Sequence, residues 1–175
     1  MKIFSLFRNV ILRIDLVICI VVAAFFCGCY SFTGGSTIPS HIKTLYISSV
    51  NDLSGYGNPN FRNILMQNLI DKFKKDNSFE VVERSGDARL NVSINSIREE
   101  ALTISPGELE RERKINVSCE VEYYDVIKKK QIWKKTFSNS QVYELALAQA
   151  ARDEAIRVAL DQISDDTLLA VVSGW

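Results

Sequence analysis

Residues 115–123 read Ile-Asn-Val-Ser-Cys-Glu-Val-Glu-Tyr, and this stretch decides the fold. Its odd-numbered positions are apolar or aromatic, and its even-numbered positions are polar. Because successive side chains of a β-strand point to opposite faces, the alternation predicts a strand with one buried and one solvated face. Residues 88–94 alternate in the same way and predict a second such strand. A turn around 126–130 leads into residues 131–137, which we expect to pair with 115–123 as a hairpin.

Two helices are expected, one before these strands in the sequence and one after them. Asn58 and Pro59 suit the N-cap and the first helical position, and Asn77 can end the helix. Between them, large apolar side chains recur every four residues, which is typical of one buried helical face: Phe61, Leu65, Leu69 and Phe73. Residues 141–172 contain neither proline nor glycine and predict a second helix, with Ser140 as its cap and a possible break at 164–166.

The order of these elements predicts an α+β fold. A first strand is expected at 44–50, followed by loop residues 51–57, and residues 79–83 form a short strand that we group with 88–94 as one region. The resulting order is strand, helix, three strands, helix. Alternating strands have one apolar face, so both helices should pack on that face. We therefore predict a two-layer sandwich with a mixed sheet of about four strands, whose other face is polar.

The composition argues against several functional classes. The chain has 175 residues, 21 basic and 21 acidic side chains and a single histidine, His41, which we expect at the surface. Zero net charge disfavours nucleic-acid binding, which requires a basic excess. One histidine leaves no multi-histidine metal site. Cys119 lies in phase with the apolar positions of its strand and is expected to be a buried small residue rather than a nucleophile. We therefore predict no enzymatic activity, no metal and no cofactor.

The N-terminus predicts export. Basic residues precede an apolar run from 16 to 26, which is too short to span a bilayer and is typical of a signal peptide. The sequence Phe26-Cys27-Gly28-Cys29 resembles the lipobox of bacterial lipoproteins, in which a small residue precedes the lipidated cysteine. We assign residues 1–28 to the signal peptide and lipidation to Cys29. Lipidation at Cys27, an ordinary signal peptide and an uncleaved anchor remain alternatives. After cleavage at this site only Cys119 keeps a free thiol, so no intramolecular disulfide is expected.

Residues 29–40 are small and polar and predict a tether before a single domain over 41–175. The segments 29–36, 38–39 and 42–44, the loop 51–57, residues 79–85 and the ending 170–175 together resemble the LptE family of lipopolysaccharide-assembly lipoproteins, in the form found outside the proteobacteria. The resemblance implies a periplasm-facing outer-membrane lipoprotein that plugs an LptD-type β-barrel and helps to insert lipopolysaccharide into the outer leaflet. A lipoprotein of another envelope machine, such as the curli-secretion type, is the alternative.

The densest basic cluster is Lys128, Lys129 and Lys130, at the expected hairpin turn. Lysine is a point-charge partner for phosphate, so this cluster is a candidate contact for the phosphates of lipopolysaccharide. The alternative is a solvated loop whose lysines keep a sheet edge soluble. The charged run 108–114 is expected to be a solvated entrance to the strand, and the alternative is that it lines a barrel lumen.

Three large aromatic side chains are candidate anchors for a protein partner. They are Trp133, Phe137 and Trp175, close to the last strand and the C-terminus. Aromatic residues are favoured at the centres of interfaces, although the same residues are equally common in cores.

Overall fold

The computed structural model of the protein describes residues 38–102 and 111–173. The elements follow one another as β1 (Thr44–Ile47), β2 (Asn51–Asp52), α2 (Asn60–Asp76), β3 (Glu80–Val82), β4 (Ala88–Ala101), β5 (Glu112–Asp125), β6 (Lys130–Glu144), the 3₁₀ turn η1 (Leu145–Leu147) and α3 (Ala148–Ser173). The signal peptide, the lipobox and most of the tether lie outside these residues. Among the described helices, none is both long enough and apolar enough to cross a membrane.

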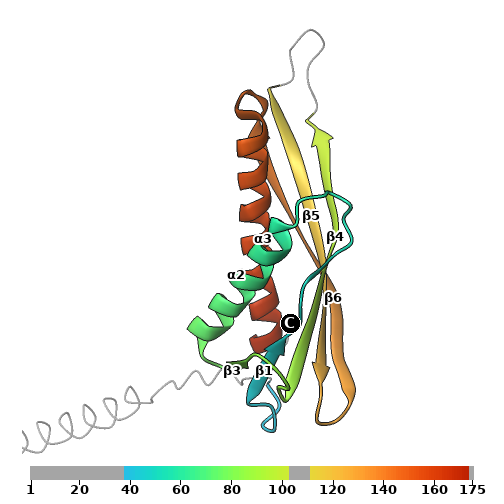
Figure 1. The fold of residues 1–175 in the computed structure, drawn as a ribbon, viewed down its shortest axis with the longest axis vertical. Coiled ribbons are helices and arrows are strands. Elements are labelled where there is room, and N and C mark those ends of the chain that lie inside the picture. Colours follow the sequence, from blue (N-terminus) through green and yellow to red (C-terminus); the bar gives the residue numbers. More distant parts are fainter. Residues whose placement is uncertain (1–37, 103–110, 174–175) are drawn as a thin grey trace, which may run out of the picture. The chain divides into compact units, whose positions relative to one another are not determined.

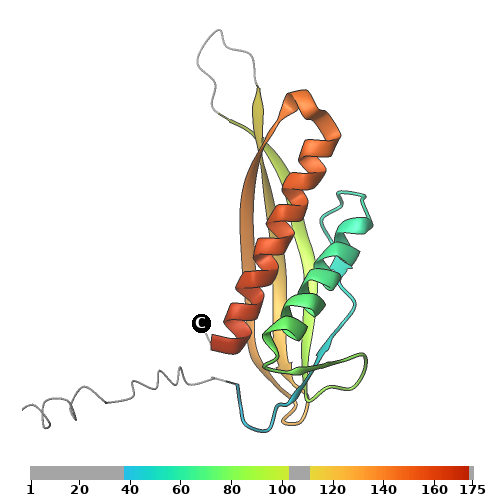
Figure 2. The same ribbon diagram turned by 90° about the vertical axis from the view of Figure 1, so that its left-hand side faces the viewer.

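The strands form one mixed sheet with the order β3-β1-β4-β5-β6. The short strand β2, which follows β1 in the chain, also pairs with β4. β1 runs parallel to β3 and β4, whereas β4, β5 and β6 form an antiparallel meander. Both helices cover the same face of the sheet (Figures 1 and 2). The predicted α+β class and the hairpin are therefore confirmed. The region 79–94 is two separate strands on either side of β1, so the sheet has more strands than the sequence predicted.

The core lies between the helices and the apolar face of β5. Val121 is paired with Val92, and Cys119 is paired with Ile94 and Phe137. Cys119 is fully buried, and this burial raises the pKa of its thiol to about 12. A thiol with such a pKa stays protonated at neutral pH and is a poor nucleophile. The prediction that Cys119 is a core residue is confirmed.

Helix α2 follows its sequence pattern closely. The four side chains at four-residue spacing are its buried face: Phe61, Leu65, Leu69 and Phe73. Asn58 accepts a hydrogen bond from the backbone N–H of Asn60 at 3.1 Å, although the helix begins only after Pro59. At the other end Asn77 has φ 60°, and its N–H donates to the carbonyl oxygen of Phe73 at 3.2 Å. Asn77 therefore ends the helix as predicted.

The second helix starts later than predicted. Residues 141–144 continue β6, because Gln141 pairs with Ile115 and Glu144 with Glu112. Ser140 is a strand residue whose hydroxyl donates to the Oδ1 of Asn116, so its prediction as a helix cap is wrong. The absence of glycine and proline from this stretch did not show where the strand ends and the helix begins, because a segment without these residues can form either a strand or a helix. Pairing with residues 112–115 of β5, which lie 26 to 32 positions earlier in the chain, decides it.

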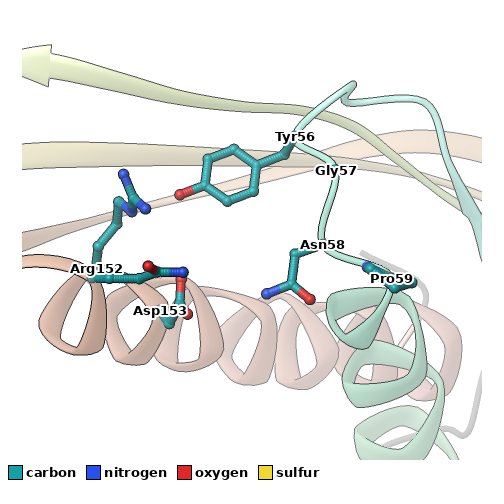
Figure 3. A pocket seen from close by; sticks show the side chains of 7 residues that line it. Tyr56, Gly57, Asn58, Pro59, Arg152 and Asp153 are labelled. Carbon is teal, nitrogen blue, oxygen red and sulfur yellow. The ribbon is translucent and has the colours of Figure 1, made fainter.

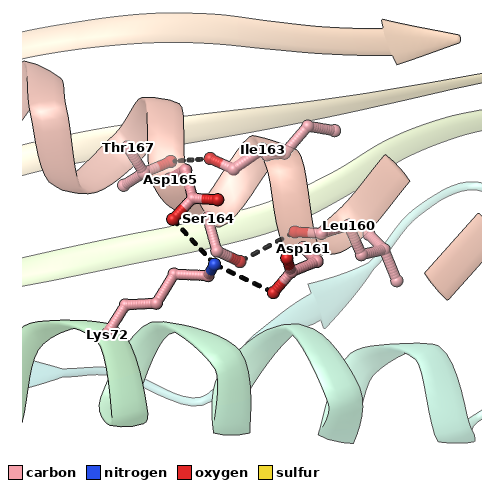
Figure 4. A network of polar contacts seen from close by, with 7 residues as sticks. All are labelled: Lys72, Leu160, Asp161, Ile163, Ser164, Asp165 and Thr167. Carbon is pink, nitrogen blue, oxygen red and sulfur yellow. Dashed lines mark hydrogen bonds and ion pairs between the residues drawn. The ribbon is translucent and has the colours of Figure 1, made fainter. Parts of the chain in front are cut away.

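Helix α3 also runs through residues 164–166 without a break. The hydroxyls of Ser164 and Thr167 are buried and donate to the carbonyl oxygens of Leu160 and Ile163, each at 2.8 Å (Figure 4). A hydroxyl that bonds back to the preceding turn needs no partner outside the helix. The polar residues that suggested a bend are therefore accommodated within a continuous helix.

Lys72 joins the two helices. Its ammonium group lies 2.9 Å from Asp161 and 2.7 Å from Asp165 (Figure 4). Burial alone would lower the pKa of Lys72, but the hydrogen bonds to Asp165 and Asp161 outweigh it and raise the pKa. The charged form of the lysine is therefore the one that this helix pair stabilises.

We expect Lys72→Met to lower the free energy of unfolding by about 0.5–1 kcal/mol, since both aspartates are more than half exposed and solvent weakens the attraction. Urea unfolding in low and high salt measures this, and the loss should shrink in high salt because ions screen the pair. Lys75→Met, on an exposed position of the same helix, is the matched control. A loss that is equal for the two variants would contradict the role of the ion pairs.

Candidate functional site

The lysine cluster lies at the tip of the hairpin between β5 and β6. Residues 126–129 form the turn, and Asp125 pairs with Lys130 at its base. Lys128, Lys129 and Lys130 are all exposed. The turn requires a left-handed backbone at Lys129, with φ 53°. The structure therefore brings three positive charges together on one exposed turn, as the sequence predicted.

Asp125 lies beneath the turn and organises it. Its buried carboxylate accepts the backbone N–H of Lys128 at 2.8 Å and contacts the Nε2 of His41 at 2.6 Å. Burial would raise the pKa of Asp125, but the N–H of Lys128 and the contact with His41 lower it below its ordinary value. The carboxylate is therefore ionised at neutral pH and holds both partners.

His41 connects the start of the domain to the hairpin tip. The sequence predicted a surface residue, but its ring is half-buried against Asp125, which lies 84 residues further along the chain. No local pattern could reveal this contact, because it depends on β1 and β5 both lying beside β4. As a result, residue 41 is fixed beside the lysine cluster.

Trp133 lies near the same tip and Phe137 lies at the middle of β6, both on the helix-facing side of the strand. The rings of Tyr123 and Trp133 are 5.6 Å apart, and those of Trp133 and Phe137 are 6.3 Å apart. Both side chains are half-buried against the core, and Lys135 lies 5.4 Å from the centre of the Trp133 ring. They therefore belong partly to the core and partly to the edge of the sheet. Trp175 lies outside the described residues.

The face of the sheet that turns away from the helices is polar over three adjacent strands. Its hydroxyl and amide groups bond across the strands: Ser138 to Ser118 at 3.1 Å, and Ser140 to Asn116 at 2.5 Å. At the same face Lys134 lies 2.7 Å from Glu120. The side chains at its centre are mostly short, namely Ser93, Ser96, Asn116, Ser118, Thr136, Ser138 and Ser140. The predicted polar face is present: short side chains occupy much of its centre, and long charged side chains such as Glu120, Glu122 and Lys134 lie on the same face.

At the end of the sheet away from the hairpin tip, the carboxylate of Glu99 is hydrogen-bonded to three side chains. It accepts hydrogen bonds from the hydroxyl of Tyr143 at 2.9 Å, from Arg152 at 3.2 Å and from Arg113 at 3.4 Å. The sequence analysis missed this cluster because its members come from four elements and share no spacing. Of the charged run 108–114, residues 108–110 lie outside the described residues, Arg111 and Glu112 are exposed, and Arg113 belongs to this cluster.

The Glu99 cluster predicts a pH dependence. Burial would raise the pKa of Glu99, but the Tyr143 hydroxyl and the guanidinium of Arg152 lower it below its ordinary value of 4.5. A carboxylate with a lowered folded-state pKa stabilises the fold above its unfolded-state pKa, and this contribution is lost as the pH falls through the folded-state value. We expect Glu99→Gln to cost about 1 kcal/mol at pH 7 and less at acidic pH. Urea unfolding of both proteins across this range measures it, and a pH-independent difference would contradict the assignment.

A shallow hollow of about 410 Å³ lies beside this cluster, between the start of α2 and the start of α3. In Figure 3 the hydroxyl of Tyr56 points toward the guanidinium of Arg152, whose Cζ lies 5.7 Å from the centre of the Tyr56 ring. Asp153 lines the same hollow. Within the described part of the chain, no group of three histidine, cysteine or acidic side chains is placed to hold a metal ion. The hollow brings together no nucleophile with a base to activate it.

Solved structures of several lipoproteins share this fold. Lipoprotein B from Nitrosomonas europaea is 14% identical, with a TM-score of 0.55 over 78% of this chain and 85% of that one. Rare lipoprotein B from Shewanella oneidensis is 16% identical, with a TM-score of 0.51 over 73% and 92%. A minor lipoprotein from Acinetobacter baumannii is 12% identical, with a TM-score of 0.50 over 76% and 92%. At these identities the likeness concerns the fold alone.

The sequence itself carries the family assignment. No curated protein sequence matches the chain. The model of the LptE lipopolysaccharide-assembly family, however, matches residues 42–171, which include every described helix and strand except the last two residues of α3. This is a family of non-enzymatic assembly lipoproteins of the cell envelope, in agreement with the absence of a predicted catalytic site. The chain therefore belongs to the LptE family of lipopolysaccharide-assembly lipoproteins.

Proposed function

We propose that the protein is an outer-membrane lipoprotein that faces the periplasm, sits in the lumen of a large LptD-type β-barrel and supports the insertion of lipopolysaccharide into the outer leaflet. The observation that carries the proposal is the polar outer face of the sheet. The interior of a large membrane barrel is itself polar, so a partner inside it must offer hydrogen-bonding groups rather than an apolar patch. Short side chains such as Ser118 and Ser138 also permit close approach of a barrel wall.

Export and anchoring belong to the same proposal. Residues 1–28 act as the signal peptide, Cys29 carries the lipid, and residues 29–40 tether it to the domain. Several acyl chains are needed for stable attachment, because one chain binds a membrane only marginally. Intact-mass analysis of the mature protein tests this step: a lipidated chain that begins at Cys27, or an unmodified one, would contradict it.

Two sets of side chains are proposed contacts. Lys128, Lys129 and Lys130 offer point charges to phosphate groups of lipopolysaccharide. Trp133 and Phe137 offer the exposed parts of their rings at the edge of the sheet to the barrel, together with Trp175. Both aromatic side chains of β6 are half-buried, so their truncation would also disturb the core.

The test is purification of the tagged, lipidated protein from outer membranes in mild detergent, followed by mass spectrometry of what accompanies it. We expect a large β-barrel in near-equal amount. Ser138→Arg places a long charged side chain on the polar face and should reduce barrel recovery at least several-fold. Val158→Arg, at an exposed position of α3 away from the polar face of the sheet, is the matched control and should leave recovery unchanged.

The alternatives give different results. Recovery of the protein alone, in a ring with itself, or with components of a secretion channel would contradict the barrel proposal and favour another envelope machine. A barrel that remains bound to Ser138→Arg as well as to Val158→Arg would show that the sheet face is not the contact.

A further inference from the structure

The hairpin tip carries aliphatic as well as basic side chains. Val126 and Ile127 precede the three lysines and are 39% and 54% exposed, and Ile132, just after them, is 38% exposed. We propose that this tip, residues 126–132, is a second membrane contact that rests on the anionic phospholipid surface beside the lipid anchor and fixes the orientation of the domain. The proposal rests on the proposed function in one respect, the lipid at Cys29, and it assigns Lys128, Lys129 and Lys130 to phospholipid phosphates instead of lipopolysaccharide.

The chemistry of the tip suits a bilayer surface. Exposed aliphatic side chains enter the boundary between headgroups and acyl chains, while lysines beside them are attracted to anionic headgroups. An ammonium group is a compact point charge on a flexible stem and needs no fixed partner geometry. A convex turn with both kinds of side chain therefore matches a layer of phosphates over hydrocarbon.

The backbone of the turn supports a role for these side chains. Lys129 has φ 53°, in the region where a side chain is sterically disfavoured and glycine is not. Folding alone would favour glycine at this position. A lysine there keeps a third positive charge at the tip at the expense of local backbone strain.

The position of the tip relative to the start of the domain is the second, independent observation. The contact of His41 with Asp125 at 2.6 Å fixes residue 41 directly beneath the turn. Cys29 is twelve residues earlier, a distance of at most about 40 Å if fully extended and of roughly 20 Å for a flexible chain.

The opposite end of the sheet is much further from the anchor. Along β6, Val142 is twelve residues from Lys130, which corresponds to roughly 40 Å of strand. A lipid at Cys29 therefore holds the hairpin tip, rather than the Glu99 end of the sheet, close to the membrane.

The test uses the full lipidated chain in vesicles of phosphatidylethanolamine with about 25% phosphatidylglycerol. An environment-sensitive fluorophore is attached to Ile127→Cys or, as the matched control, to Val142→Cys, since the two native side chains are equally exposed at 54%. Cys119 is fully buried and escapes labelling. We expect a blue-shifted emission and several-fold quenching by spin-labelled lipid at position 127 and neither effect at 142.

The charge requirement is tested on the same labelled protein. The triple variant Lys128→Gln, Lys129→Gln and Lys130→Gln should reduce quenching several-fold, as should vesicles without phosphatidylglycerol. The control triple variant Arg98→Gln, Arg111→Gln and Lys114→Gln removes the same charge from the other end of the sheet and should leave quenching unchanged.

Each contrary result overturns the proposal. A water-exposed probe at 127 in anionic vesicles, or equal quenching at 127 and 142, excludes an oriented contact. Quenching that requires added lipopolysaccharide would assign the lysines to lipopolysaccharide instead of phospholipid. Intact mass of the lipidated protein and barrel recovery from outer membranes report the proposed function separately, so its failure is distinguishable from failure of the tip contact.

Discussion

Phe73→Ala is expected to lower the free energy of unfolding by about 3–5 kcal/mol. The Phe73 ring is fully buried in the last turn of α2, and its centre lies 6.2 Å from that of the Phe79 ring, which directly precedes β3. Truncation removes the apolar burial and leaves a cavity that neighbouring helix and strand atoms cannot fill by small movements. Because domains of this size have only about 5–15 kcal/mol of net stability, the variant should be close to its unfolding threshold at 37 °C.

Urea unfolding followed by circular dichroism measures this loss. The matched control is Leu53→Ala, which also truncates a large apolar side chain but at a position that is 69% exposed, and it should change stability by less than about 0.5 kcal/mol. Similar losses for the two variants would mean that α2 is not packed on the sheet as described.

Gly86→Ala is expected to cost roughly 3 kcal/mol, although the substitution adds only one methyl group. A Cβ atom at position 86 would lie 2.7 Å from the backbone nitrogen of Tyr46 and 2.9 Å from the carbonyl oxygen of Ala88. Both neighbours are main-chain atoms of paired strands, since Tyr46 lies in β1 and Ala88 begins β4. The clash can therefore be relieved only by separating these strands, which hold the parallel part of the sheet together.

Gly55→Ala is the informative comparison. That position has nothing within 4 Å of an added Cβ, and its only penalty is a φ of 70°. The backbone conformation should cost about 1 kcal/mol there, less than the close approach at Gly86. Thermal unfolding of the two variants separates the effects, and a smaller loss for Gly86→Ala would contradict the close packing of β1 against β4.

The local sequence accounts for the elements whose signals are periodic. The alternation in β5 and the four-residue spacing in α2 both report burial of one face, and the structure buries the same residues. Periodicity did not locate the end of β6, because residues 141–144 suit a helix as well as a strand until β5 is beside them. Strand pairing is a long-range interaction, and a single-element pattern does not contain it.

The candidate sites divide in the same way. The sequence placed Lys128, Lys129 and Lys130 on one turn because they are consecutive. It did not reveal that His41 is bound to Asp125 beneath that turn, or that Arg152 and Tyr143 meet at Glu99. These contacts join residues 44 to 84 positions apart.

The sequence by itself determined the fold class, the buried faces and the family of this protein, because each of these depends on the order of residue types along the chain. The tertiary structure alone decided which end of the sheet lies beside the start of the domain at residue 41. The physical reason is that β1 and β5 lie on either side of β4 only in the folded sheet. That arrangement brings His41 to Asp125 and places the hairpin tip beside the start of the described domain.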